Sequence, residues 1–281
     1  MAGWHTLLAC PHCGAGLAET GSALACEAGH SFDVARQGYV NLLPGGASAG
    51  TADTPEMVEA RMAFLARGHF RTLDDTLADA VAAVVDGTEG CVIDVGAGTG
   101  EHLAAVLERL PGRAGLALDI SKHAARRAAR AHPRIGAVVC DAWGTLPVRD
   151  GVAAAVMCVF APRNAPEFAR VLARGGGLVV VTPTPLHLEE LVAPLGLVSV
   201  DPRKEERLEA SLGGHFERRA TRVVECRMSL SRADALAAAL MGPSAHHMLP
   251  GEAESRVADL PEPVAVTLSV SVSMWSIAGA G

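Results

Sequence analysis

The sequence predicts an α/β protein built on a mostly parallel, seven-stranded β-sheet, with a small metal-binding domain before it. Two observations lead to this prediction. From residue 91 onward, short apolar runs alternate with helical stretches, as in parallel strands joined by crossover helices. Before that region, cysteine and histidine recur at the spacing of metal ligands. We therefore expect a metal-binding domain at 1–43, a linker and helices at 44–88, and the sheet domain at 89–281.

Length and composition indicate a globular protein with reduced thiols. The chain has 281 residues, of which 49% are hydrophobic, enough for a sizeable core. It has no apolar run of signal-peptide length and no apolar stretch of about 18 residues, so we expect a soluble, cytoplasmic protein without membrane contact. Seven cysteines, an odd number, favour metal binding over disulfides. The net charge of −7 gives no bulk attraction for nucleic acid, so RNA contact would need local cationic patches.

The first domain holds four candidate metal ligands in two pairs. Cys10 and Cys13 form a C-x2-C pair, and Cys26 and His30 form a C-x3-H pair further along. Three thiolates and one imidazole suit tetrahedral Zn²⁺. Because so short a segment cannot bury enough apolar area to fold alone, metal binding would drive its folding. Two unrelated thiol pairs are the alternative. His12 competes for the fourth position, but its ring would point outward.

Two helices are expected between the domains. A Gly-, Ser- and Ala-rich stretch reaches Thr54, which with Pro55 supplies an N-cap and a first-turn proline for a helix ending near Arg67. A second helix should run from about Arg71 to Val85. The remaining cysteines lie in or beside apolar runs and are expected in the core; they are Cys91, Cys140, Cys158 and Cys226.

The sheet domain begins with a strand, a glycine loop and a helix. The β-branched run 91–95 predicts a buried strand. Gly96, Gly98 and Gly100 follow it at every second position, before a helix at 101–110. Glycine allows a sharp turn and the close approach of a ligand, and the amides at the start of the helix point at the turn. We therefore expect a nucleotide-binding loop; a glycine-rich turn without a ligand is the alternative.

The alternation continues to the C-terminal third. Further strands are expected at 115–119, 136–140, 152–159 and 177–182, and helices at 122–131, 165–173 and 186–193. Two β-rich runs, 222–231 and 264–277, flank a helix at 232–240 and indicate an antiparallel pair at one end of the sheet. The run 264–277 alternates apolar and polar residues, so we expect a half-exposed edge strand that leaves a homodimer open.

Acidic residues near the glycine loop restrict the ligand. The pattern D-x-G-x-G-x-G, which starts at Asp94, differs from the dinucleotide fingerprint G-x-G-x-x-G. Glu101, at the start of the helix, would repel a pyrophosphate. S-adenosylmethionine has no phosphate and carries an ammonium and a sulfonium, so it suits this loop. Asp119 ends the next strand and is placed to accept both ribose hydroxyls, a feature that NAD-binding folds share.

Asp141 ends the third strand at the same edge of the sheet. Ligands of α/β sheets bind beyond the carboxyl ends of the strands, so we expect Asp141 and Ala142 to meet the adenine. Asp141 would accept from N6, and the backbone of Ala142 would donate to N1. Capping of a turn is the alternative role for Asp141.

These motifs together resemble a known family. The glycine loop with Asp119 and Asp141 resembles class I S-adenosylmethionine-dependent methyltransferases, which have a Rossmann-like fold. The run C-P-H-C…C-x3-H-S-F-D-V-A-R-Q-G-Y-V-N-L-L-P, followed by G-H-F, D-V-G-A-G-T-G-E and T-P-x-P-L-H-L, resembles the 23S rRNA (guanine-N1)-methyltransferases of the RlmA family, and most closely their actinomycete, tylosin-resistance branch. The similarity spans essentially the whole chain. It implies an N-terminal zinc ribbon that recognises RNA, a Zn²⁺ ion, S-adenosylmethionine as methyl donor and 23S rRNA as partner.

The resemblance also implies a reaction and its site. The methyl acceptor would be guanine N1 at nucleotide 748, or alternatively 745, in a hairpin that lines the peptide exit tunnel, and its methylation would give resistance to tylosin-type macrolides. Phe70 stands where other members carry Tyr, so a hydroxyl contact is lost and stacking remains. His187 is an implied cofactor contact, with a structural role in a first helical turn as the alternative. The expected cofactor-binding set is Phe70, Asp94, Gly96, Gly98, Thr99, Gly100, Glu101, His102, Asp119, Asp141, Ala142 and His187.

The segment 160–164 lies where related enzymes hold the target base. Pro162 and Asn164 are its candidates, because prolines fix the backbone so that carbonyls can point at a planar nitrogen. The segment has no carboxylate, so no general base is assigned, and positioning of N1 in line with the sulfonium would supply most of the acceleration.

Two clusters of cations are candidates for RNA contact, with a solvated surface as the alternative. They are Lys122, Arg126, Arg127, Arg130 and Arg134, and Arg218, Arg219 and Arg222. Two other functions remain open at this point: a small-molecule methyltransferase that uses the ribbon as a dimerisation or lid module, and a non-enzymatic regulator that binds S-adenosylmethionine as an effector.

Overall fold

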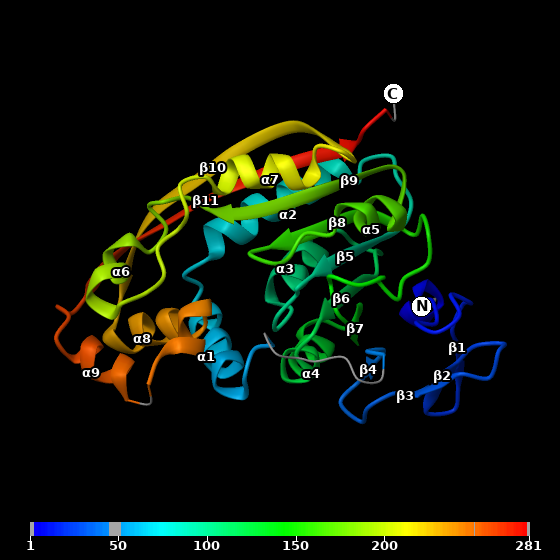
Figure 1. The fold of residues 1–281 in the computed structure, drawn as a ribbon, viewed down its shortest axis with the longest axis horizontal. Coiled ribbons are helices and arrows are strands. Elements are labelled where there is room, and N and C mark those ends of the chain that lie inside the picture. The colour runs from blue at the N-terminus through cyan, green and yellow to red at the C-terminus, as the bar shows by residue number, and fades with distance from the viewer. Residues whose placement is uncertain (1–2, 45–51, 250, 280–281) are drawn as a thin grey trace.

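An eight-stranded sheet runs through the centre of the molecule and carries helices on both faces (Figure 1). The computed structural model describes residues 3–44, 52–249 and 251–279, so the Gly-, Ser- and Ala-rich stretch 45–51 lies outside the described residues. The strand order is β10-β11-β9-β8-β5-β6-β7-β4. The bounds are β4 (Tyr39–Asn41), β5 (Cys91–Val95), β6 (Gly115–Asp119), β7 (Ile135–Val139), β8 (Ala153–Val159), β9 (Leu172–Pro183), β10 (Phe216–Leu230) and β11 (Val264–Ile277).

The helices form two covering layers. One buried cluster lies between the sheet and α2, α3 and α4, and the other lies under α5, α7 and the N-terminal segment. The expected helices are confirmed within a few residues, whereas α7 and α9 were not predicted. The helices are η1 (Trp4–Leu7), α1 (Pro55–Ala66), α2 (Arg71–Val84), α3 (Glu101–Arg109), α4 (Lys122–Ala131), α5 (Ala165–Val171), α6 (Glu189–Leu195), α7 (Lys204–Leu212), α8 (Arg232–Leu240), η2 (Pro243–His247) and α9 (Glu252–Ala258).

The sheet has one strand more than the seven that the sequence predicts. The seven predicted strands are all present, and β4 is added beside β7 in parallel register, with Val40 opposite Val138. The Leu42 amide then donates to the Val139 carbonyl at 2.9 Å, and Val40 is fully buried. Because β4 lies within residues 1–43, the N-terminal segment contributes to the large sheet; the division at residue 43 stays a prediction.

The expectation that 264–277 forms a half-exposed edge strand is wrong. β11 lies between β10 and β9 and pairs antiparallel with both. Most of its hydroxyl side chains are buried, and two of its serines find partners inside the protein: Ser269 Oγ lies 2.6 Å from Thr184 Oγ1, and Ser273 Oγ donates to the Val180 carbonyl at 3.2 Å. Small hydroxyl residues therefore alternate with apolar ones without facing solvent. Because β10, and not β11, lies at this edge of the sheet, β11 cannot pair with a second copy of the chain and gives no support for a homodimer.

The N-terminal segment folds as a small antiparallel sheet of β1 (Ala18–Thr20), β2 (Ala23–Ala25) and β3 (Ser31–Asp33). It is joined to the large sheet by buried side chains, since Leu8 bridges to Val148 and shares a core cluster with Leu24 and Val138. In Figure 1 it lies at the end of the molecule opposite α6, α8 and α9. Across the described part of the chain, no helix combines the length and apolar character needed to cross a bilayer.

Candidate functional site

Four side chains of the N-terminal segment converge as a metal site. The Sγ atoms of Cys10, Cys13 and Cys26 and the ring nitrogen of His30 all lie within 4.8 Å of one another. His30 Nδ1 is 3.5 Å from Cys10 Sγ and 3.4 Å from Cys26 Sγ, and Cys13 Sγ is 3.7 Å from Cys26 Sγ. Tetrahedral Zn²⁺ with ordinary bond lengths separates its ligands by roughly 3.5–3.8 Å. The site therefore fits a Cys3His zinc centre. His12 instead stacks on Phe32.

The glycine loop after β5 needs its glycines for two reasons. Gly96, Gly98 and Gly100 have φ values of 72°, 56° and 86°, in the left-handed region that disfavours side chains. A Cβ on Gly96 would lie 2.4 Å from the Cβ of Ala161, and one on Gly100 would lie 2.9 Å from the Cα of Ala128. The glycines thus bring neighbouring segments against the loop, and Gly96 alone of the three lines a cavity.

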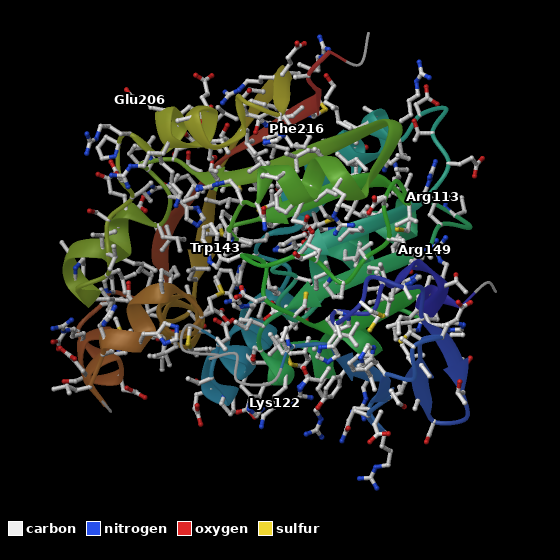
Figure 2. All side chains as sticks on the ribbon, turned by 45° about the vertical axis from the view of Figure 1, so that its right-hand side comes forward. Arg113, Lys122, Trp143, Arg149, Glu206 and Phe216 are labelled. Atoms are coloured by element: carbon white, nitrogen blue, oxygen red, sulfur yellow. The ribbon has the colours of Figure 1, made fainter. Side chains whose placement is uncertain are left out.

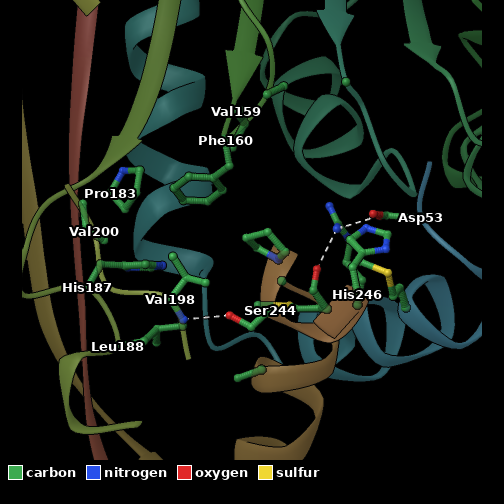
Figure 3. A pocket seen from close by; sticks show the side chains of 18 of the residues that line it. Asp53, Val159, Phe160, Pro183, His187, Leu188, Val198, Val200, Ser244 and His246 are labelled. Atoms are coloured by element: carbon green, nitrogen blue, oxygen red, sulfur yellow. Dashed lines mark hydrogen bonds and ion pairs between the residues drawn. The ribbon is translucent and has the colours of Figure 1, made fainter. Parts of the chain in front are cut away.

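A cavity of about 600 Å³ opens at the carboxyl ends of the parallel strands. Figure 3 shows side chains of the last third of the chain facing the ends of β8 and β9 across it. One wall, here called the glycine-loop side, contains Gly96, His102, Asp119, Ile120, Asp141 and Ala142. The wall called the aromatic side contains Phe70, Phe160, Pro183, His187, Leu188, Val198, Val200 and Lys204.

Asp119 joins the glycine loop to the end of β6. Its Oδ2 accepts from the Gly98 amide and its Oδ1 accepts from the Ser121 amide, both at 2.8 Å. Burial raises the pKa of Asp119 to about 6, although these two amides favour the charged form. Each carboxylate oxygen keeps a second lone pair, so the side chain can still accept from a ligand's hydroxyls.

Asp94 is a buried carboxyl with no protein partner. Its side chain is 1% exposed, and no group in the described residues hydrogen-bonds either oxygen. Burial raises the pKa of Asp94 to about 7, with an opposing effect from His102 and a further rise from Asp119. Buried polar atoms are rarely left unpaired, so these oxygens indicate a place for a donor or cation that the protein itself does not supply.

The first turn of α3 contributes a polar cluster behind this wall. Thr99 is buried and donates through its hydroxyl to Glu101, so neither side chain lines the cavity. His102 does line it, and its Nδ1 lies 2.6 Å from Asp74 Oδ1. Burial opposes the imidazolium, but the hydrogen bond and charge of Asp74, together with the charges of Asp94 and Glu101, raise the pKa of His102. The loop is therefore bordered by fixed, mainly acidic groups.

Asp141 serves as a turn cap and also faces the cavity. Its Oδ1 accepts from the Trp143 amide at 2.9 Å, which confirms the capping alternative, and both Asp141 and Ala142 line the cavity. Trp143 itself is 68% exposed at this rim. The turn leaves the second carboxylate oxygen and the ring of Trp143 available to a ligand.

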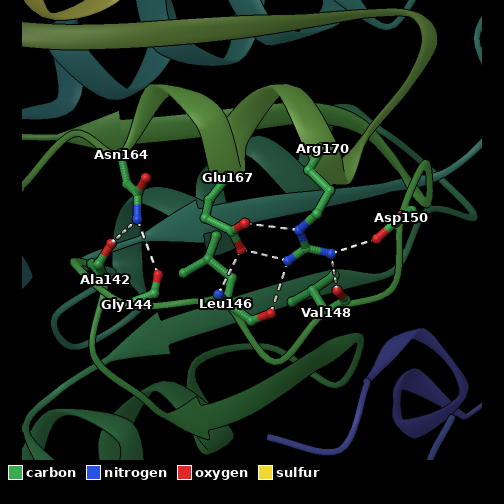
Figure 4. A network of polar contacts seen from close by, with 8 residues as sticks. All are labelled: Ala142, Gly144, Leu146, Val148, Asp150, Asn164, Glu167 and Arg170. Atoms are coloured by element: carbon green, nitrogen blue, oxygen red, sulfur yellow. Dashed lines mark hydrogen bonds and ion pairs between the residues drawn. The ribbon is translucent and has the colours of Figure 1, made fainter. Parts of the chain in front are cut away.

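A polar network holds the loop after β7 in place (Figure 4). Arg170 pairs with Glu167 at 2.5 Å and donates to the Val148 carbonyl at 2.8 Å, while Glu167 accepts from the Leu146 amide at 2.7 Å. Asn164 donates to the Ala142 and Gly144 carbonyls, each at 3.0 Å. Asn164 therefore braces the wall of the cavity, and its own side chain does not line it.

The two target-base candidates differ in position. Pro162 lines the cavity, but its carbonyl accepts from the buried Cys158 thiol at 3.3 Å and is turned toward the core. The expected carbonyl contact to a base is therefore not preformed here. Burial raises the pKa of the Cys158 thiol to about 12, in agreement with its expected core role.

Three rings form the aromatic side. Phe160 stacks on His187 with centroids 5.5 Å apart, and Phe70 lies 6.0 Å from His187 and 6.5 Å from Phe160. Phe160 has a φ of 54° and is 42% exposed, whereas Phe70 is buried. His187 Nδ1 accepts from the Ser269 amide at 3.4 Å, and burial, with the charge of Lys204, lowers the pKa of His187 to about 4. At neutral pH His187 is an uncharged ring that presents Nε2–H.

Sequence reasoning did not single out Arg61, which closes the cavity over the glycine loop. Arg61 packs against Gly98 and pairs with Asp53 at 2.7 Å, and it donates to the Met241 carbonyl at 2.8 Å. The backbone of Asp53 is in turn held by the Ser121 hydroxyl at 2.8 Å. These contacts join α1 to the C-terminal end of α8 and to the end of β6. Only the combination of α1 with distant segments reveals this role, so no local motif could have identified it.

The predicted cation clusters have different environments. Lys122, Arg126 and Arg130 are exposed on α4 and form no ion pair within the described residues; Figure 2 shows Lys122 at the surface. Arg134 instead donates to carbonyls at the end of α3. In the second cluster, Arg218 pairs with Glu205 and lies over Trp275, and Arg219 pairs with Glu217. The face of α4 is therefore the stronger candidate for RNA.

The residues present fit S-adenosylmethionine. The unpartnered Asp94 carboxyl suits its ammonium, Asp119 keeps acceptors for ribose hydroxyls, and Asp141 with Ala142 lines the cavity, where the adenine is expected. S-adenosylmethionine would supply a methyl group activated on a sulfonium. The residue-by-residue contacts remain predictions, as do those at Thr99, Glu101 and Asn164.

Comparisons with known proteins agree with both parts of the chain. The zinc-ribbon family model described as "RlmA, N-terminal" matches residues 8–47, and the "Methyltransferase domain" model matches residues 92–176. A 23S rRNA (guanine(748)-N(1))-methyltransferase of Streptomyces fradiae is 50% identical, over 95% of this chain and 95% of its own length. A protein of Micromonospora griseorubida, provisionally named a 23S rRNA (guanine-N(1)-)-methyltransferase, is 50% identical over 95% of this chain and 96% of its own. The chain belongs to the RlmA family of 23S rRNA (guanine-N1)-methyltransferases.

Proposed function

We propose that the protein transfers a methyl group from S-adenosylmethionine to N1 of guanine 748 in 23S rRNA and thereby confers resistance to tylosin-type macrolides. The observation that carries this proposal is the identity of 50%, across 95% of both chains, with the guanine-748 methyltransferase of Streptomyces fradiae. Guanine 745 is the alternative position. Such a substrate implies action in the cytoplasm, where ribosomal RNA is made.

The cavity supports a base substrate. Its acidic wall suits the methyl donor, and its opposite wall offers the rings of Phe160 and His187 for stacking. Exposed aromatic side chains commonly hold unstacked RNA bases, and Trp143 at the rim is a further candidate. A guanine within a folded hairpin would have to leave its stack to reach this depth.

RNA contact outside the cavity is expected on α4 and the zinc ribbon. The exposed cations Lys122, Arg126 and Arg130 can neutralise phosphates although the whole chain is acidic. Arg36 is also exposed, and its neighbour Gly38 lies against Ala129 of α4. Ribbon and helix thus form one cationic surface beside β4.

Mapping of methyl incorporation tests the proposal. Unmodified 23S rRNA and a hairpin fragment are incubated with the purified protein and labelled S-adenosylmethionine, and the product is analysed by primer extension. We expect a stop at guanine 748, because a methyl on N1 blocks Watson–Crick pairing. A stop at 745 would correct the position. Incorporation only into small metabolites, by protein that still binds zinc and cofactor, would overturn the function.

A growth assay tests the resistance. Expression in a tylosin-sensitive strain that lacks the methyl group should raise the tylosin concentration needed to stop growth. The control is the Asp119→Ala variant, which should fold but not bind the methyl donor. Equal sensitivity of the two strains, with guanine 748 methylated in one of them, would contradict the resistance claim.

A further inference from the structure

One cation of the aromatic side has no assigned role in the transfer of the methyl group. Lys204, the first residue of α7, lines the cavity and is one of only two lysines in the chain. It is half-buried and forms no ion pair within the described residues. Its positive charge helps to lower the pKa of His187, which lies on the same side of the cavity. A half-buried ammonium at a substrate wall is costly unless an anion meets it there.

The surroundings of Lys204 do not provide that anion. The charged groups that act on it are Arg163, from the segment after β8, and Asp201. Asp201 is engaged elsewhere, because it pairs with Arg207 at 2.9 Å and accepts from the Arg203 amide at 2.9 Å. Burial, together with the charge of Arg163, lowers the pKa of Lys204. Lys204 and Arg163 together therefore make this part of the aromatic side electropositive. Pro162, the neighbour of Arg163, lines the same cavity.

No group on this side is set up to remove a proton. His187 holds its Nδ1 against the Ser269 amide and so presents a donor, Nε2–H, to the cavity. Four acids line the cavity. Asp119 and Asp141 belong to the opposite wall and already accept from backbone amides, whereas Asp53 and Asp201 are held in ion pairs with Arg61 and Arg207. A general base for guanine N1 is thus missing from the aromatic side, as it is from the segment 160–164.

Guanine N1 can be activated without a base of its own. Its N–H is adjacent to the C6 carbonyl, so loss of the proton spreads negative charge onto O6. A fixed cation near O6 stabilises that charge and raises the fraction of reactive, deprotonated base at neutral pH. The proton passes to solvent water. The N1 lone pair then forms the N1–CH3 bond while the carbon–sulfur bond breaks and the sulfonium becomes a neutral thioether.

We propose that the ammonium of Lys204 stabilises the negative charge on O6 of the target guanine while N1 of that base accepts the methyl group. This inference rests on the proposed function, since it requires guanine N1 as the acceptor. It assigns the activation step to an electrophilic cation in place of a general base.

The test compares three variants on the intact chain, loaded with zinc, with an RNA fragment of 23S rRNA as substrate. Lys204→Met removes the charge at similar size, Lys204→Arg keeps it, and Arg203→Met removes a neighbouring positive charge that does not line the cavity. Single-turnover methylation is measured from pH 6 to pH 10, with RNA saturating. Thermal unfolding and S-adenosylmethionine binding show whether each variant is folded.

We expect Lys204→Met to slow the single-turnover rate about 100-fold at pH 7, comparable to the loss of one oxyanion-hole donor. The defect should shrink as the pH rises, because hydroxide then deprotonates N1 without help and because the wild type loses the Lys204 proton. Lys204→Arg should recover most of the rate, and Arg203→Met should keep the profile of the wild type. Lys204→Met should leave the RNA affinity within about twofold.

Three results would overturn the inference. A defect of equal size at all pH values would mean a packing role. A defect confined to RNA affinity, with a weaker salt dependence, would show that Lys204 meets a backbone phosphate. A wild-type methylation rate in the Lys204→Met variant would exclude any role of Lys204 in the reaction. If the wild type itself fails to methylate guanine N1, the proposed function fails, and that outcome is visible before any variant is made.

Discussion

The two walls of the cavity are assembled in different ways. The glycine-loop side comes from the carboxyl ends of three adjacent parallel strands, β5, β6 and β7, and each end has an acid: Asp94 within β5, Asp119 at the end of β6 and Asp141 after β7. The aromatic side combines segments that lie far apart in the sequence, from Phe70 to Lys204. The first wall therefore follows from the topology of the sheet, whereas the second depends on how the last third of the chain packs. Substitutions on the two walls should accordingly separate binding of the methyl donor from binding of RNA, except at Phe70 and His187, which the family resemblance implies as donor contacts although they lie on the aromatic side.

The largest separation is expected from Asp119→Ala. This change removes the predicted acceptors for two ribose hydroxyls and the bonds to the amides of Gly98 and Ser121. Charged hydrogen bonds contribute about 1.5–3 kcal/mol each, so affinity for S-adenosylmethionine should fall at least 100-fold. Isothermal calorimetry measures this loss, and a filter-binding assay should find RNA affinity within about twofold. Equal losses of affinity for S-adenosylmethionine and for RNA would show that the two walls do not bind separate ligands.

The pH dependence of donor binding gives the next largest effect. The ammonium of the ligand favours ionised Asp94, whose pKa burial raises to about 7 in the free protein. Affinity should therefore be full above that pKa and fall as the pH drops through it, by about tenfold between pH 8 and pH 6. Calorimetry across this range measures the effect and the proton released on binding at pH 7.

Asp94→Asn provides the control for that experiment. The amide cannot ionise, so the affinity should be low at all pH values and should lose this part of its pH dependence. A variant that still loses tenfold between pH 8 and pH 6 would contradict the assignment to Asp94. Asp119, whose pKa burial raises to about 6, accounts for only about twofold over this range.

Phe160→Ala addresses the aromatic side. Phe160 is partly exposed and stacks on His187, so its loss should weaken RNA binding about fivefold, the lower range for one stacked base. Donor binding should change by less than about twofold. The matched substitution Trp143→Ala lies on the other wall but has an exposed ring. If Trp143→Ala weakens RNA binding more than Phe160→Ala does, the RNA contacts both walls, and the aromatic side is not the only RNA-binding wall.

The smallest effect is expected from Phe70→Tyr. Phe70 is buried against Phe64, with its ring 6.0 Å from His187. A hydroxyl at its tip would add one neutral hydrogen bond, which should raise affinity for S-adenosylmethionine about threefold. A loss of affinity, measured by calorimetry, would show that this side of the cavity has no room for the added oxygen.

The sequence predicted what local patterns can encode. The zinc ligands, the glycine loop and the acids at strand ends occupy short, contiguous motifs, and the alternation of strands and helices defined the parallel sheet. It failed where tertiary contacts decide. β11 alternates serine with valine, which suggested an exposed face, but Thr184 and Val180 satisfy the serine hydroxyls inside the sheet.

The missed elements have the same explanation. α7 offers only two buried apolar residues, Leu208 and Leu212, so its helical pattern is short and weak. In the sequence Lys204 is one charge in a polar run, and only the packing of α7 against the cavity brings it to the cavity wall. Arg61 is similar, because its partners Asp53 and Met241 lie on separate segments.

Strand β4 has a consequence for the modularity of the protein. Because Tyr39–Asn41 extends the sheet next to β7, the ribbon cannot be exchanged or deleted like an appended recognition module. A chain begun at residue 44 would expose the flank of β7, the strand that leads to Asp141. Loss of zinc should therefore disturb β7, through its three backbone pairs with β4, and with it the position of Asp141 at the cavity. Methylation would then be sensitive to the cell's metal supply.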